Sequence, residues 1–114
     1  MAQRFNWNNL ESATVAQLLD SHTLDSHGFG DTYRELIARL EAEAPHEVVL
    51  DFSSVHSISS SGLRRLLKLK EKVASRGGSL TLSNVGDRVQ EVFSLARLAR
   101  YFGLQQNSKL RRTG

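Results

Sequence analysis

Cysteine is absent from the sequence, which excludes disulfides, thiolate metal sites and cysteine nucleophiles and fits a reducing compartment. Long apolar runs are missing too: nowhere do about 18 apolar residues follow one another, so no membrane span is predicted. The first ten residues, MAQRFNWNNL, lack the apolar core of a signal peptide. We therefore expect a soluble cytoplasmic protein.

Charge of one sign is not in large excess. The net charge is +3 over 114 residues, which does not by itself indicate a nucleic-acid binder. No helix-turn-helix pair is evident, and no aromatic residues are interleaved with basic ones for base stacking. A Walker phosphate loop is also missing. The sequence predicts one domain, large enough to fold without disulfides or metals, with no cofactor and no nucleic-acid partner.

Hydrophobic periodicity predicts seven secondary-structure elements. Short apolar or alternating runs predict strands over residues 4–9, 13–19, 47–52 and 79–85. Apolar residues at helical spacing predict helices over 30–44 and 61–75, and a third helix that begins near residue 86. The order β-β-α-β-α-β-α is typical of an α/β fold with a largely parallel sheet, to which the opening hairpin adds an antiparallel edge.

The expected boundaries of these elements follow from single residues. Asp31 or Ser26 is positioned to cap the first helix, and Pro45 ends it because the residue before a proline is pushed out of helical geometry. The RGG sequence at 76–78 ends the second helix. The last residues, 105–114, have no apolar pattern, so we expect a domain over 1–104 followed by a flexible basic tail.

The second helix has an apolar and a basic side. The apolar side carries Leu63, Leu66, Leu67, Val73 and Ala74, with Leu69 at its border. Lys70 falls within the apolar arc, and we expect its stem to pack while its ammonium reaches water. The basic side, expected to be exposed, carries Arg64, Arg65, Lys68, Lys72 and Arg76. This side is a solvated helix surface, a face on which another protein docks or, as the least favoured alternative, a surface for nucleic acid.

A serine cluster, Ser59, Ser60 and Ser61, stands directly before this helix and is followed by Gly62. A serine there caps a helix, because its hydroxyl accepts a hydrogen bond from a free amide of the first turn. One serine is enough for a cap, so another hydroxyl is left at the positive end of the helix, where a phosphate is stabilised. Capping alone and a phosphorylation switch are both consistent with this pattern.

Two catalytic or metal-binding alternatives use the histidines. His56, Asp51 and Ser60 can be combined into a serine hydrolase triad, although the G-x-S-x-G sequence is missing. His22 and His27 flank Asp25 in a turn region, where they are candidate metal ligands. Scattered histidines in loops usually bind no metal, so we predict none.

Taken together, these motifs resemble a known family. The motifs are, in order, an apolar strand with LDFS at 50–53, SSSG at 59–62, an amphipathic helix, RGG, the strand LTLSNV and a last helix with LARYF. In this combination they resemble a STAS domain of the bacterial anti-sigma factor antagonist type. The resemblance covers residues 13–104. It implies a STAS-like mixed sheet with helices packed largely on one side, and no enzymatic activity.

The resemblance also implies partners and site residues. Family members bind an anti-sigma factor that is often a serine kinase, and so regulate transcription; phosphorylation breaks the complex, and a PP2C-like phosphatase restores it. By position, Ser60 is the phosphorylated serine, with Ser59 as the alternative acceptor. The resemblance places the docking surface on Asp25, Ser59, Ser61, Gly62, Arg64, Arg65 and Lys68.

One position departs from the family pattern. The aspartate that precedes the phosphorylated serine in the family is Ser59 here, which removes a fixed negative charge and adds a second acceptor hydroxyl. The resemblance therefore leaves an alternative open, a STAS scaffold without phosphorylation or a subunit of a larger signalling or transport assembly. Whether the domain forms a homodimer is also open.

Overall fold

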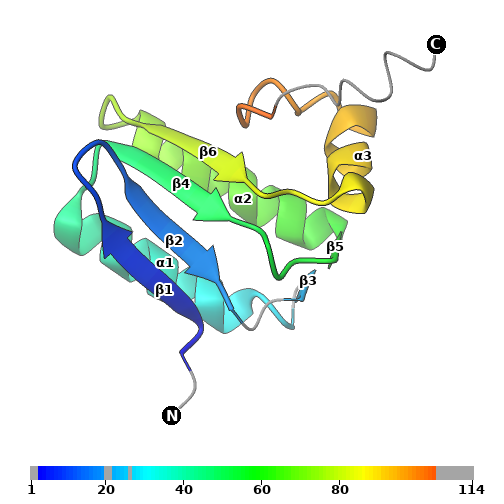
Figure 1. Cartoon of the computed structure of the whole chain (residues 1–114), viewed down its shortest axis with the longest axis horizontal. Helices are drawn as coiled ribbons and strands as arrows, with labels where there is room; N and C mark the ends of the chain where they lie inside the picture. Colours follow the sequence, from blue (N-terminus) through cyan, green and yellow to red (C-terminus); the bar gives the residue numbers. More distant parts are fainter. Residues whose placement is uncertain (1–2, 20–21, 26, 105–114) are drawn as a thin grey trace.

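The structure, a computed structural model, describes residues 3–19, 22–25 and 27–104. Its main sheet has four strands in the order β1-β2-β4-β6 (Figure 1). β1 (Phe5–Asn9) pairs antiparallel with β2 (Thr14–Leu18), which is followed in parallel by β4 (Glu47–Asp51) and β6 (Ser79–Ser83). The predicted parallel sheet with an antiparallel edge is confirmed. The predicted tail at 105–114 lies outside the described residues.

The strand register separates a buried face of the sheet from a partly exposed one. Ala16, Leu50 and Leu82 lie side by side on the three inner strands, and each is at most 6% exposed. Val15 and Val49, one position earlier, point to the opposite face and are half-buried. The alternation expected for a sheet covered on one face is therefore present.

Two helices cover the buried face. α1 (Gly30–Glu43) and α2 (Ser60–Ala74) both lie behind the sheet in Figure 1, as the predicted arrangement with helices on one side requires. α3 (Asp87–Leu95) follows β6. The largest fully buried side chains of the core are Phe29, Phe52, Phe93, Phe102, Leu18, Leu24, Leu36, Leu40, Leu50, Leu66, Leu69 and Leu80.

The C-terminal ends of α1 and α2 lie where the sequence predicts them, but the predicted N-terminal cap of α1 does not form. α1 stops at Ala44, which is left-handed (φ 46°) and directly precedes Pro45, and Gly77 after α2 is also left-handed (φ 81°). The expected side-chain cap of α1 is wrong for Asp31, because the N-cap residue is Phe29 and no side chain caps the helix. Ser26 lies outside the described residues.

The buried side of α2 is rotated from the predicted one. Leu69, expected at the border, is fully buried, whereas Ala74 is exposed. The ammonium of Lys70 makes two contacts that the sequence does not predict. Its Nζ donates to the Leu80 carbonyl oxygen at 3.0 Å and lies 4.9 Å from the ring centroid of Tyr101. Desolvation by this burial lowers the pKa of Lys70.

The chain after α3 packs back onto the sheet. Phe102 is fully buried, with its ring edge-on to Phe93 at 5.2 Å, and its carbonyl oxygen accepts a hydrogen bond from the amide of Leu82 on β6. Within the part of the chain that is described, no helix has the length and apolar character needed to cross a membrane.

Candidate functional site

A second, very short sheet carries the start of α2. β3 (Thr23–Leu24) and β5 (Ser57–Ile58) pair in parallel, two residues each. The sequence pattern predicts neither of these strands. Directly after β5, the amide of Ser59 donates to the Leu24 carbonyl oxygen at 2.9 Å, which continues the ladder to the first residues of the helix. The short sheet therefore fixes where α2 begins.

Ser59 is the N-cap residue of α2. Its Oγ accepts a hydrogen bond from the amide of Gly62 at 3.3 Å, donates to the Leu24 carbonyl oxygen at 3.1 Å and lies 3.0 Å from the Oγ of Ser61. The hydroxyl thus satisfies one free amide of the first turn and also joins the helix to β3. Ser59 is engaged in the structure of the site rather than presented to solvent.

Gly62 permits the close approach of α2 to β3. A Cβ atom on this residue would lie 2.1 Å from the carbonyl oxygen of Leu24 and 2.7 Å from its carbonyl carbon. Both are backbone atoms, which cannot rotate away as a side chain can. The glycine of the SSSG sequence is therefore required by packing, and any larger residue would displace the helix from the strand.

Ser60 differs from Ser59 in its exposure and in its hydrogen bonds. It is the first residue of α2, its side chain is exposed, and its hydroxyl makes no hydrogen bond with any described residue. Arg64 follows four residues later and is exposed, so the two side chains lie on the same face of the helix. The structure therefore leaves one free hydroxyl at the positive end of the helix, beside a guanidinium group.

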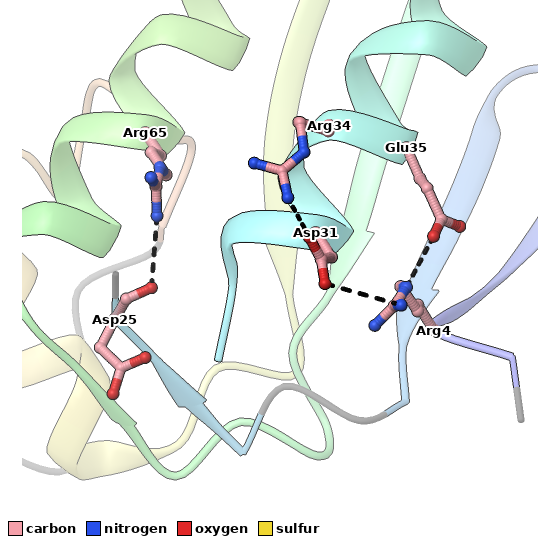
Figure 2. Close-up of polar contacts among 6 residues, drawn as sticks. All are labelled: Arg4, Asp25, Asp31, Arg34, Glu35 and Arg65. Carbon is pink, nitrogen blue, oxygen red and sulfur yellow. Dashed lines mark hydrogen bonds and ion pairs between the residues drawn. The ribbon is translucent and has the colours of Figure 1, made fainter. Parts of the chain in front are cut away.

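The outer face of α2 is less uniform than predicted. Arg64 and Lys68 are exposed, as expected, but the expectation is wrong for Lys72, which is half-buried. It is wrong for Arg65 as well, because this residue is also half-buried. Its guanidinium lies 5.6 Å from the ring centroid of Tyr33 on α1 and donates to the carbonyl oxygen of Asp25 at 3.4 Å (Figure 2). Arg65 joins α2 to the loop before α1.

Asp25 organises this loop with its carboxylate. Its Oδ1 accepts hydrogen bonds from the amides of His27, at 3.0 Å, and Gly28. Because Asp25 directly follows β3, and Arg65 bonds to its carbonyl oxygen, the structure brings it beside the start of α2. All seven residues that the sequence proposed for a docking surface therefore lie on α2, its cap or the adjoining loop.

The structure does not assemble the hydrolase triad. The Asp51 carboxylate accepts hydrogen bonds from the Ser53 amide at 2.8 Å and from the Asn84 side chain at 3.2 Å. The ring of His56 stacks on that of His22, with centroids 5.6 Å apart and planes 16° apart. Among the described residues, no hydrogen bond joins Asp51, His56 and Ser60, so the interactions that define a triad are missing.

The metal-site alternative finds no support in the described parts of the chain, which contain no group of three or more His, Asp or Glu side chains able to hold an ion. The Oδ1 atom of Asp25 accepts hydrogen bonds from two backbone amides. Asp25 and His27 are instead parts of a turn, in which the carboxylate of Asp25 binds the amide of His27.

Comparison with known proteins agrees with this architecture. An anti-sigma factor antagonist from Mycobacterium paratuberculosis has a similar structure, with a TM-score of 0.72 and 21% identity over 96% of this chain and 90% of that chain. The Bacillus cell fate determinant SpoIIAA in its phosphorylated form gives a TM-score of 0.65 and 17% identity over 96% of this chain and 99% of that one.

A sulfate transporter family protein from Wolinella succinogenes is similar as well, with a TM-score of 0.67 and 21% identity over 82% of this chain and 74% of that chain. A search of curated protein sequences gave no match. At these identities the solved structures show the fold. The family model of the STAS domain, in contrast, matches residues 13–112 directly. The chain therefore belongs to the STAS domain family, as the resemblance predicted.

Proposed function

We propose that this protein is a cytoplasmic anti-sigma factor antagonist. It acts by binding, without enzymatic activity of its own, and its partner is an anti-sigma factor with serine kinase activity. Phosphorylation of Ser60 by that partner weakens the complex, and a PP2C-like phosphatase restores it. The protein thereby regulates transcription through the sigma factor that the partner holds.

The observation that carries this proposal is the contrast between two adjacent serines. The hydroxyl of Ser59 is held by Leu24, Ser61 and Gly62, whereas that of Ser60 is exposed and free of hydrogen bonds with described residues. A kinase needs a hydroxyl that can enter its active site without dismantling the substrate. This favours Ser60 over Ser59 as the acceptor, although Ser59 replaces the aspartate that the family has at this position.

The switch is electrostatic. A phosphate adds a charge of about −1.5 to −2 near neutral pH and three acceptor oxygens. On Ser60 it would lie on the same helix face as Arg64 and at the positive end of the helix dipole, so it would neutralise the basic surface that Arg64 and Lys68 present. A partner with acidic groups facing this surface would lose its attraction and meet repulsion instead.

The remaining residues of the proposed docking surface position this switch. Gly62 and Ser59 hold the start of α2 against β3, and Arg65 holds the helix against the loop of Asp25. In this proposal the partner contacts Arg64 and Lys68 directly, with Asp25 and Ser61 at the edge of the contact. The half-buried Arg65 acts by fixing the relative position of the helix and the loop.

A second candidate function is a STAS scaffold that is not phosphorylated, within a larger assembly. The structural similarity to a sulfate transporter family protein and the serine at position 59 favour it. The two candidates differ in one respect that can be measured. In a scaffold, a negative charge at Ser60 has no special effect on partner binding compared with the same charge elsewhere on α2.

The experiment is a calorimetric titration of the anti-sigma factor kinase from the same organism with four forms of the protein: wild type, Ser60→Ala, Ser60→Glu and Ser75→Glu. Ser75 lies at the other end of α2, about 20 Å away. We expect Ser60→Ala to bind as the wild type does, Ser60→Glu to bind at least about tenfold more weakly and Ser75→Glu to bind within about threefold, because only the first charge falls within the contact. Equal affinities of both glutamate variants would contradict the proposal.

A further inference from the structure

The outer edge of β1 presents main-chain groups in a defined order. β1 pairs with β2 in a regular antiparallel register, from Phe5 opposite Leu18 to Asn9 opposite Thr14. At the two ends of β1, the carbonyl oxygen of Arg4 accepts from the Leu19 amide, and the Leu10 amide donates to the carbonyl oxygen of Ala13. The main-chain groups of the even-numbered residues Arg4 and Leu10 therefore point toward β2. Because bonding alternates along an antiparallel strand, the amides and carbonyls of the odd-numbered residues point away from β2.

These outward residues are Phe5, Trp7 and Asn9, and within the described parts of the chain β1 has no strand neighbour other than β2. Natural sheet edges are usually protected by charged residues, proline or a bulge. The sequence of β1, FNWNN, has no charged residue and no proline, and its register with β2 is unbroken. β1 itself therefore carries no charged residue, proline or bulge that would oppose the addition of another strand.

The edge is also held rigidly. The guanidinium of Arg4 bonds to Glu35 of α1 at 2.6 Å, and the indole Nε1 of Trp7 donates to Glu43 at 3.0 Å (Figure 2 shows the first contact). A strand that is already fixed loses little conformational entropy when another strand pairs with it. The edge is thus preorganised for pairing.

We propose that a second copy of this chain pairs with this edge, β1 against β1 in antiparallel orientation, around a two-fold axis at Trp7. This proposal does not depend on the proposed function. The axis places Phe5 opposite the partner's Asn9 and Trp7 opposite the partner's Trp7. These are the residues whose main-chain groups point outward, so each facing pair exchanges two hydrogen bonds. The two four-stranded sheets become one continuous sheet.

The side chains favour a second copy over a foreign strand. With this axis, Asn6 faces the partner's Asn8 on the face of the sheet that α1 and α2 leave open. Each amide side chain offers both donors and an acceptor, so the same pair is complementary on both sides of the axis. No charged side chain within β1 opposes its own copy. A two-fold interface requires this kind of self-complementarity.

Pairing of two short strands alone is too small for a specific interface, which needs roughly 1,000 Å² of buried surface. Beside β1 the molecule has a hollow of about 710 Å³, lined by Gln3, Arg4, Phe5, Glu35, Ala38, Arg39 and Ala42. The two-fold axis brings the partner's α1 alongside this hollow, where Phe5 and two alanines supply apolar surface. None of the residues of the serine site lies on β1 or lines the hollow, so the dimer presents two such sites.

The test is sedimentation equilibrium of the full chain with charges placed on both facing asparagines. The wild type should show a reversible monomer–dimer equilibrium. Asn6→Lys/Asn8→Lys and Asn6→Glu/Asn8→Glu each place like charges opposite one another in two symmetric pairs, and each should raise the dimer Kd by about tenfold or more. An equimolar mixture of the two should dimerise again, because opposite charges then face each other.

The matched control is Asn6→Glu/Asn8→Lys, which carries the same number of new charges but is complementary to itself under the proposed axis. It should dimerise at least as well as the wild type, and circular dichroism checks that each variant is folded. A wild type that stays monomeric at 200 µM, about the highest convenient concentration, would overturn the proposal. So would a dimer that the like-charge variants leave intact, or a mixture that stays monomeric.

Discussion

Gly62 offers the most quantitative test of how the serine site is built. In Gly62→Ala the new Cβ would lie 2.1 Å from the carbonyl oxygen of Leu24, whereas real Cβ atoms essentially never come within 3.0 Å of another atom. The helix and β3 must therefore separate by roughly 1 Å, the difference between these two distances. That carbonyl accepts both hydrogen bonds from Ser59, at 2.9 and 3.1 Å, and a shift of this size breaks at least one of them.

The expected loss of stability follows from three contributions. Overpacking in a close contact costs about 1–3 kcal/mol, and a lost hydrogen bond costs about 1 kcal/mol. Alanine in place of glycine within a helix returns up to about 1 kcal/mol. We therefore expect Gly62→Ala to lower the free energy of unfolding by about 2 kcal/mol.

The assay is urea unfolding followed by circular dichroism, with Gly30→Ala as the control. Gly30 is also a glycine in the first turn of a helix, but its Cβ would make only an ordinary contact, 3.8 Å from Arg65. The control should unfold within about 0.5 kcal/mol of the wild type or be slightly more stable. If Gly62→Ala were as stable as Gly30→Ala, the close approach of α2 and β3 would be wrong.

Three further predictions concern other contacts. Ser59→Ala should lower the free energy of unfolding, measured with urea, by about 1 kcal/mol because the cap is lost. Ser60→Ala should change it by less than about 0.5 kcal/mol. The reverse order of the two effects would show that Ser60 is the cap. The hydrogen bonds from Trp7 and Asn9 lower the pKa of Glu43, so its folded pKa lies below the unfolded value near 4.5. The ionised Glu43 should therefore stabilise the fold above pH 4.5, and this contribution should be lost as the pH falls through the folded pKa. In thermal melts at a series of pH values, the melting temperature of Glu43→Gln should fall less on acidification than that of the wild type. Equal falls would show that the contact is absent. Lys70→Met should increase amide hydrogen exchange in residues 98–104 by removing the bond to Leu80 and the contact with Tyr101, and unchanged exchange would refute that role of Lys70.

Much of the main fold was predictable because it consists of long segments with a clear hydrophobic period that end at proline or glycine. The alternation in β2 and β6, the helical spacing in α1 and α2, and Pro45 after α1 each correspond to a local physical rule. The two strands β3 and β5 were missed because a strand of two residues has no readable period. They form only because the chain brings Leu24 and Ile58 together from distant positions.

The serine site was predictable in composition but not in detail. The sequence shows that one serine caps α2, but three adjacent serines are equivalent candidates until the helix start is known. The structure assigns the cap to Ser59 because its Oγ accepts a hydrogen bond from the Gly62 amide, and the same hydroxyl also donates to the Leu24 carbonyl oxygen. Arg65 was misplaced for a similar reason. Helical spacing groups it with Arg64, but Tyr33 of a neighbouring helix covers it, and no pattern within α2 contains that information.

The proposed switch depends on a regulatory phosphate at Ser60. The most direct measurement is intact-mass and peptide mass spectrometry of the protein purified from the cells that make it, compared with the Ser60→Ala variant from the same cells. We expect a single phosphate that maps to Ser60 and is missing from the variant. A protein that stays unmodified across growth conditions, or a phosphate that maps to Ser59 or to any other residue, would contradict it.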